Sequence, residues 1–107
     1  MSYSMHVQEL KQRLDNGDDI VLLDVREAWE HSLANINGSV LIPLGEIPQS
    51  LDRLDKDAEI VCYCHHGIRS ADAMSFLLQH GFSNVKNLVG GIDAWSILVD
   101  PTVPRYQ

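Results

Sequence analysis

Short apolar runs alternate with segments of helical periodicity along this chain. The runs are rich in aliphatic residues and lie at residues 20–24, 40–42 and 59–63, and the run 20–24 is expected to be a strand buried on both faces. A last short strand is expected at residues 85–88. Between the runs, apolar residues recur at spacings of three and four, as they do on the buried side of a helix. The alternation predicts an α/β fold in which helices cover both faces of a parallel sheet. No repeat or linker divides the 107 residues, which indicates a single domain, 1–107.

The helices are expected in the gaps between these runs. Ser4 is a candidate N-cap for the first helix, because its hydroxyl can accept a hydrogen bond from a free N–H group of the first turn. Asn16 and Gly17 are typical of the end of that helix. The expected helices lie, in order, between Ser4 and Asn16, around residues 27–32, between Pro43 and Asp57, between Ala71 and Gly81, and at residues 92–98.

A cysteine, Cys64, stands directly after the third apolar run. Ligands of parallel sheets bind beyond the carboxyl ends of the strands, and Cys64 falls at such an end. The short loop after it leads into a helix, so the loop N–H groups and the positive end of the helix dipole are expected to face one point. A thiol in that position has a lowered pKa and reacts as the thiolate. We therefore expect Cys64 to be a nucleophile in an anion-binding loop that consists of His65, His66, Gly67, Ile68, Arg69 and Ser70.

Two geometric conditions decide this assignment. The loop N–H groups must point at the sulfur of Cys64, and the Cys64 side chain must not be buried away from solvent. Gly67 gives the loop the backbone freedom for a tight reversal. Arg69 either binds the anion of a substrate or pairs with Asp24 or Glu27 and braces the loop, and the sequence leaves both roles open.

The other cysteine, Cys62, lies inside the third run, where it is expected to be a small core residue. Both thiols are expected to be free, because a disulfide between residues two apart would close a strained ring. A metal centre is not expected. The four candidate ligands Cys62, Cys64, His65 and His66 are too close in sequence to enclose a tetrahedral zinc ion, and no second pair accompanies them.

Four motifs, in order along nearly the whole chain, are similar to those of the rhodanese family. They are Asp24-Val-Arg26-Glu27, the segment 36–43, the loop from Cys64 to Ser70, and Gly90-Gly-Ile-Asp-Ala-Trp95. The resemblance implies a rhodanese-like fold with a central five-stranded parallel sheet and helices on both faces. It also implies a sulfurtransferase of the thiosulfate:cyanide type. Cys64 would accept a sulfane sulfur from a donor such as thiosulfate, hold it as a persulfide and pass it to cyanide or a thiol. No cofactor is expected, and Asp24 and Arg26 are expected to hold the frame of the site.

Two other functions stay open at this point. A binding module with the same fold would pass or sense sulfur only in complex with a partner. A cysteine phosphatase would use the pattern Cys-x-x-x-x-x-Arg, whereas Arg69 here follows Cys64 by five positions, one residue short of that pattern. The smaller ring suits a single sulfur atom on Cys64 better than a tetrahedral phosphate ester.

The composition limits the partners. Lys and Arg number 8 against 15 Asp and Glu, and the resulting formal net charge of -7 argues against nucleic acid. No apolar run approaches the length of a membrane-spanning helix, so no membrane partner is expected. The N-terminus lacks the basic and apolar regions of a secretory signal, and a cytoplasmic location is therefore expected. The expected partners are a small sulfur-containing anion or persulfide donor and a protein sulfur acceptor.

Overall fold

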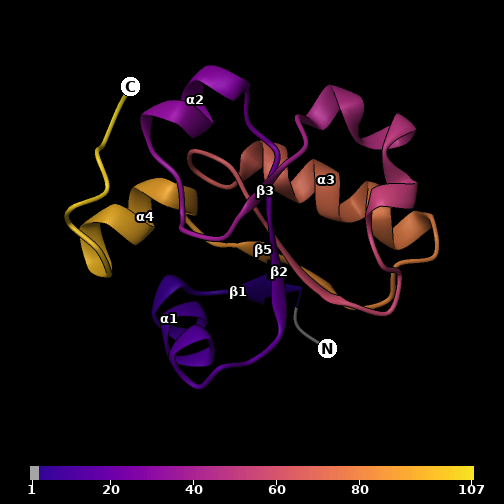
Figure 1. Cartoon of the computed structure of the whole chain (residues 1–107), viewed down its shortest axis with the longest axis horizontal. Helices are drawn as coiled ribbons and strands as arrows, with labels where there is room; N and C mark the ends of the chain where they lie inside the picture. The colour runs from indigo at the N-terminus through magenta and orange to yellow at the C-terminus, as the bar shows by residue number, and fades with distance from the viewer. Residues whose placement is uncertain (1–2) are drawn as a thin grey trace.

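The computed structural model describes residues 3–107 and contains a five-stranded sheet (Figure 1). Its strands are β1 (Ser4–Met5), β2 (Ile20–Asp24), β3 (Val40–Leu41), β4 (Glu59–Tyr63) and β5 (Val85–Leu88). They lie side by side in the order β1-β5-β4-β2-β3, and every neighbouring pair is parallel. The predicted parallel α/β fold is confirmed. The edge strand β1 pairs with β5 over two residues, too few to produce a recognisable pattern in the sequence.

Within residues 3–107, three α-helices connect strands: α1 (Val7–Asp15), α2 (Ala28–Leu33) and α3 (Ile68–Gln79). A fourth, α4 (Gly91–Leu98), follows β5. The N-cap assigned to Ser4 is wrong, because Ser4 belongs to the extended backbone of β1 and His6 occupies the cap position of α1. The cap is made without a side-chain hydrogen bond.

The helix expected between Pro43 and Asp57 is also wrong in type. Two short 3-10 helices, η1 (Leu44–Gln49) and η2 (Leu51–Arg53), replace it. Pro48 lies inside η1 and has no N–H group to donate, and Ser50 has a φ of -121°, outside the helical region. An unbroken α-helix is therefore excluded across this segment.

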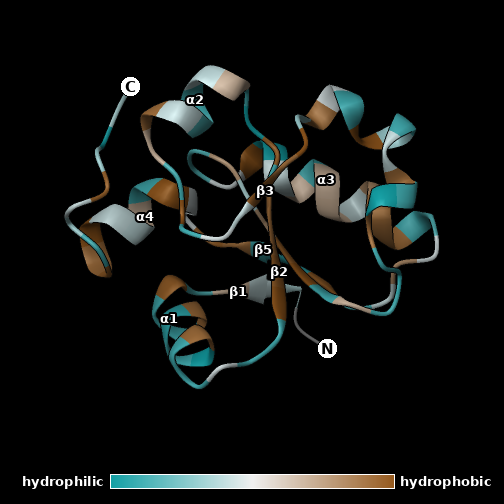
Figure 2. Ribbon diagram, viewed as in Figure 1, coloured by the Kyte–Doolittle hydropathy of each residue, from teal (hydrophilic) through white to brown (hydrophobic). Residues whose placement is uncertain are grey.

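Side chains from the two faces of the sheet form two separate cores. Along β4, Ile60 and Cys62 pack with α3 and the 3-10 helices, whereas Val61 and Tyr63 pack with α1 and α4. Figure 1 shows α1 and α4 on one side of the strands and α3 on the other. The ribbon of β2 is brown, hence hydrophobic, in Figure 2, as a strand covered on both faces requires.

The carboxyl end of the central strand β4 is held by its neighbours. The N–H of Val25, just beyond β2, donates to the carbonyl of Tyr63 at 3.1 Å. The first N–H groups of α4, from Ile92 and Asp93, donate to the carbonyls of Cys64 (2.9 Å) and His65 (3.1 Å). The backbone at the end of β4 and at the start of the following loop is thus held by hydrogen bonds from two sides.

Among residues 3–107, no helix combines the length and apolar character that crossing a bilayer requires. The single-domain organisation and the cytoplasmic location stay predictions.

A substitution at Gly91 tests how closely α4 packs against the backbone of Cys64 and His65. Its φ is +61°, and a Cβ added there would overlap the carbonyl oxygens of Cys64 and His65. Gly17 has a similar φ of +79° but open space around it. We expect Gly91→Ala to lower the free energy of unfolding by about 3 kcal/mol or more, and Gly17→Ala by about 1 kcal/mol, the strain of the left-handed backbone alone. Urea denaturation measures both losses, and equal losses would contradict the packing described here.

Candidate active site

The loop between β4 and α3 surrounds the sulfur of Cys64. The residue follows β4 directly, and α3 begins four residues later, at Ile68. Gly67 precedes α3 with a φ of +110°, a left-handed conformation that favours glycine. The N–H groups of Gly67 and Ser70 donate to Cys64 Sγ over 3.1 Å and 3.4 Å, and the Ser70 hydroxyl lies 3.3 Å from the same atom. The condition that loop N–H groups face the sulfur is therefore met.

The two cysteines have opposite electrostatic environments. Burial raises the pKa of the Cys62 thiol to about 12, and the nearby Cys64 adds to the rise. Burial also raises the pKa of Cys64, but hydrogen bonds from the Ser70 hydroxyl and from the N–H groups of Ser70, Gly67 and His66 outweigh it. The net result is a lowered pKa for Cys64, so its thiolate is favoured where that of Cys62 is not.

The second condition, access to solvent, is not met. The exposed fraction of Cys64 is 1 %, and its side chain belongs to the core on the α3 face of the sheet. The expectation of an accessible side chain is wrong for this conformation, because the loop that supplies the hydrogen bonds also encloses the sulfur. One of the two conditions set for Cys64 as a nucleophile is therefore unmet, and its catalytic role stays a prediction.

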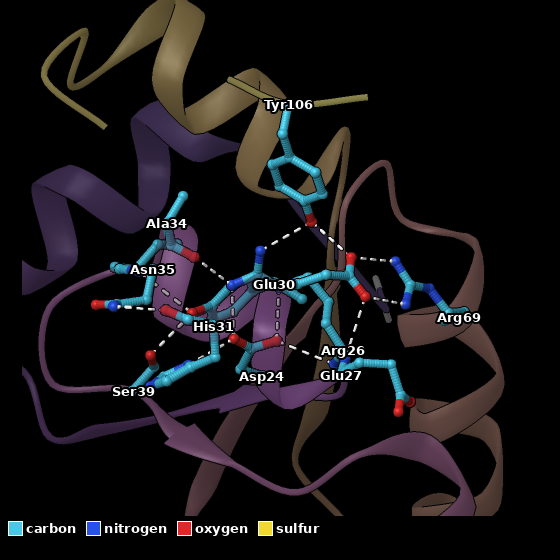
Figure 3. Close-up of polar contacts among 12 residues, drawn as sticks. Asp24, Arg26, Glu27, Glu30, His31, Ala34, Asn35, Ser39, Arg69 and Tyr106 are labelled. Carbon is cyan, nitrogen blue, oxygen red and sulfur yellow. Dashed lines mark hydrogen bonds and ion pairs between the residues drawn. The ribbon is translucent and has the colours of Figure 1, made fainter. Parts of the chain in front are cut away.

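Arg69 pairs with a residue that the sequence did not indicate. Its two terminal nitrogens donate to the two carboxylate oxygens of Glu30 at 2.8 Å and 2.9 Å (Figure 3). The expected partners Asp24 and Glu27 are wrong: Asp24 binds Arg26, and the Glu27 side chain accepts from the backbone of α2 in a capping box. Arg69 therefore braces the loop through α2.

The buried pair Asp24 and Arg26 lies at the carboxyl end of β2. Both side chains have no exposed surface, and Arg26 Nε and Nη2 donate to the Asp24 carboxylate at 2.8 Å and 2.7 Å. Arg26 also donates to the carbonyl of Ala34 (2.6 Å) and to the hydroxyl of Tyr106 (2.9 Å). Through these contacts the ion pair ties β2 to the residue that follows α2 and to the C-terminal tail, as Figure 3 shows.

The side chains of the remaining loop residues make other contacts or are exposed. The His65 ring is stacked between His66 (centroids 3.9 Å apart) and Tyr106 (4.0 Å). Burial and the neighbouring His66 lower the pKa of His65, so its imidazole is favoured in the neutral form. The His66 side chain is exposed, and Ile68 is 78 % exposed. Of the six loop residues, Gly67 and Ser70 donate hydrogen bonds to the sulfur. The backbone N–H of His66 also lowers the pKa of Cys64.

Three residues of the site escaped the sequence analysis. Asn87 of β5 accepts from the Ser70 hydroxyl at 2.5 Å and donates to the carbonyl of Gly67 at 3.1 Å, so it fixes the loop from below. The sequence offered one indication of Asn87, namely a polar amide within the short strand expected at residues 85–88. Glu30 was available as the fourth residue of the capping-box pattern that begins at Glu27. Nothing in the pattern of the tail pointed to Tyr106.

Within residues 3–107, one group of side chains has the composition of a metal site. The ligand atoms of His65, His66 and Asp93 lie within 4.8 Å of one another, beside a pocket of about 370 Å³ that the tail also lines. The Asp93 carboxylate, however, already accepts from Arg105 at 2.9 Å and 3.3 Å. A metal ion would have to displace that guanidinium, so we do not interpret the group as a metal centre.

Comparisons with known proteins agree with this geometry. The family model described as rhodanese-like domain matches residues 6–98. A crystal structure of a rhodanese-like domain protein from Staphylococcus aureus superimposes with a TM-score of 0.85 and 29 % identity, covering 100 % of both chains.

The curated relatives carry names from sulfur chemistry. A sulfurtransferase of Allochromatium vinosum is 37 % identical over 83 % of this chain and 83 % of its own. A probable adenylyltransferase/sulfurtransferase of Mycobacterium tuberculosis, MoeZ, is 38 % identical over 92 % of this chain but only 26 % of its own length. A putative sulfur carrier protein of Bacillus subtilis, YrkF, is 38 % identical over 84 % of this chain and 49 % of its own. The chain therefore spans about a quarter to a half of two of these relatives.

Glu30 makes the site sensitive to acid. Hydrogen bonds from Arg69 lower its pKa from 4.5 to about 2; burial opposes this, and the Tyr106 hydroxyl supports it. Because the folded-state pKa lies below the unfolded one, the stabilisation is present above about pH 5 and is lost as the pH falls toward 2, at most about 3 kcal/mol. We expect Glu30→Gln to lose stability at neutral pH and to flatten the acid limb of the stability profile.

Denaturant unfolding at a series of pH values measures this limb. The exposed Glu46 provides the matched control, Glu46→Gln, which should leave the limb unchanged. An acid limb of wild-type depth in Glu30→Gln would contradict the role given to Glu30.

Proposed function

This chain belongs to the rhodanese-like domain family, and from that premise we propose that it is a sulfurtransferase in which Cys64 carries sulfur as a persulfide. The observation that carries the proposal is the contrast between the two cysteines of one strand end. A structural cysteine is expected to resemble Cys62, whose pKa rises on burial. Cys64 also has almost no exposed surface, yet its pKa is lowered because donors surround its sulfur.

The first step is a displacement at sulfur. The Cys64 thiolate attacks the sulfane sulfur of the donor, and a new S–S bond forms as the bond to the leaving group breaks. With thiosulfate as donor the leaving group is sulfite, which takes the electron pair; with a persulfide donor it is a thiolate. Cys64 then holds a persulfide anion. No net redox change occurs, so no cofactor is required.

The second step returns the sulfur to an acceptor. Cyanide in an assay, or a thiolate in the cell, attacks the terminal sulfur and releases the Cys64 thiolate. The N–H groups of Gly67 and Ser70 are placed to stabilise negative sulfur before and after transfer, in the manner of an oxyanion hole. The lowered pKa of Cys64 reduces the need for a general base, because a larger fraction of the thiol is ionised.

The surroundings of the loop favour a persulfide donor over thiosulfate. Thiosulfate is a dianion and would need a cation near the sulfur. Arg69 is committed to both oxygens of Glu30, and the imidazole of His65 is favoured in the neutral form. A persulfide donor has less need of such a cation, and a protein that carries a persulfide or accepts one would be the natural partner.

A second candidate is a sulfur-relay module that receives or passes sulfur only in complex with a partner. The 1 % exposure of Cys64 favours it, since a partner would then open the site. The relative named as a putative sulfur carrier protein is consistent with it. A cysteine phosphatase is disfavoured, because the loop is one residue short and its arginine is already paired.

Persulfide formation tests the proposal by mass. The whole protein is incubated with thiosulfate and, separately, with a small-molecule persulfide. We expect a gain of about one sulfur atom that cyanide removes, absent in Cys64→Ser and retained in Cys62→Ser. The gain should be larger with the persulfide.

Three results bear against this function. Retention of the sulfur in Cys64→Ser would contradict the assignment of the nucleophile. No gain from either donor would favour the relay module. Hydrolysis of a chromogenic aryl phosphate would revive the phosphatase.

A further inference from the structure

The tail that follows α4 turns back along the site. It runs from the end of α4 toward α2, as the yellow ribbon in Figure 1 shows. The Ser96 hydroxyl of α4 donates to the carbonyl of Val103 at 2.5 Å, and Arg105 donates to Asp93 of α4. Residues 99–107 thus form an irregular segment that is fastened to one helix and lies outside the residues that the family model matches.

Tyr106 connects this tail to the catalytic loop. Its ring lies parallel to that of His65, with centroids 4.0 Å apart and planes at 9°. The Trp29 ring makes an edge-to-face contact with the Tyr106 ring, with centroids 5.9 Å apart. The stack leaves His65 Nε2 fully buried and without a hydrogen-bond partner. The residue next to the nucleophile is therefore covered by an aromatic ring from the tail.

The hydroxyl of Tyr106 fixes that ring in place. It donates to Glu30 Oε2 at 2.6 Å and accepts from Arg26 Nη1 at 2.9 Å (Figure 3). Burial and the neighbouring Glu30 raise the pKa of Tyr106 to about 12, so the hydroxyl keeps the proton that it donates. Both partners are charged, which makes these hydrogen bonds stronger than those between neutral groups.

The enclosed sulfur requires an opening motion. The tail packs in the core on the α1 and α4 face, whereas Cys64 packs in the core on the α3 face. The tail therefore acts on the sulfur through the loop, by covering His65 and by holding Glu30, the partner of Arg69. Cys64 lies between β4, α3 and α4, all of which are fixed by sheet or helix hydrogen bonds. The tail has no such ladder, and a segment of that kind belongs to the least stable part of a fold. Its release would unstack His65 and remove one of the groups that hold Glu30 on Arg69.

We propose that residues 99–107 are a movable cover over the Cys64 loop, that Tyr106 holds the cover shut, and that the cover selects sulfur donors and acceptors by size. Small species reach the sulfur through brief, partial openings, and bulky ones, such as a protein thiol, require the tail to leave. The size selection rests on the proposed function. The cover itself does not, because it concerns access to a thiol.

Alkylation of the two cysteines measures the cover without any sulfur transfer. The whole protein is treated with iodoacetamide and, separately, with a bulky maleimide, and labelling of Cys64 and Cys62 is followed by peptide mass spectrometry. Tyr106→Phe removes the hydroxyl and keeps the ring, and Tyr106→Ala removes both. Tyr3→Phe, at a half-exposed tyrosine far along the chain, is the matched control.

We expect Cys64 in Tyr106→Phe to label about tenfold faster than in the wild type, because two charge-assisted hydrogen bonds are lost and the open population rises. Tyr106→Ala should label faster still, and the gain should be greater for the maleimide than for iodoacetamide. Tyr3→Phe should label at the wild-type rate. Cys62 should stay unlabelled throughout, which shows that the fold is intact.

Wild-type labelling rates in both Tyr106 variants, with Cys62 protected, would overturn the cover. Labelling of Cys62 together with Cys64 in Tyr106→Ala would mean that this variant unfolds. The labelling rate of Cys64 in the milder variant Tyr106→Phe then decides whether the tail is a cover. Equal acceleration with both reagents would leave a cover but remove its size selection. Faster labelling without any persulfide formation would contradict the sulfurtransferase alone.

Discussion

A negative sulfur can be buried only where hydrogen-bond donors replace the water that it loses. The site depends on that requirement. The loop after β4 supplies the N–H groups of Gly67 and Ser70 and the hydroxyl of Ser70, all within 3.4 Å of Cys64 Sγ. Two positions earlier, Cys62 is more deeply buried and lacks such donors, and its pKa moves the other way. The donors of the loop, together with the lesser burial of Cys64, therefore separate the two thiols.

The loop keeps this geometry because three parts of the fold hold it from different sides. Asn87 of β5 binds the Gly67 carbonyl and the Ser70 hydroxyl. The start of α4 binds the carbonyls of Cys64 and His65. Glu30 of α2 binds Arg69 and, through Tyr106, the tail. These groups orient donors in advance, so little reorganisation is needed when charge appears on the sulfur. The same enclosure separates the sulfur from solvent, which is why the proposed sulfur transfer needs the proposed opening of the tail.

The sequence predicted the central architecture well. The strands Ile20–Asp24, Glu59–Tyr63 and Val85–Leu88 have the predicted bounds. In the first two, apolar residues follow one another as burial on both faces requires, whereas only the two end residues of Val85–Leu88 are buried. The cysteine loop was recognisable because its position after such a strand is a local property of the chain. The two-residue strand β1 and the 3-10 helices were missed, since two residues carry no periodicity and Pro48 interrupts an otherwise helical spacing. Contacts between distant segments, Arg69 with Glu30 and Tyr106 with His65, depend on tertiary packing that no local pattern encodes.

The central claim is that the loop holds Cys64 as a thiolate while Cys62 stays protonated. Nuclear magnetic resonance of protein labelled with ¹³C at the cysteine Cβ reports the two titrations separately in the folded wild type. We expect the Cβ signal of Cys64 to titrate below the ordinary pKa of a thiol and the signal of Cys62 not to move until strongly alkaline pH. A pKa of Cys64 at or above the ordinary value would contradict it, because the surrounding donors would then fail to offset the burial of the sulfur.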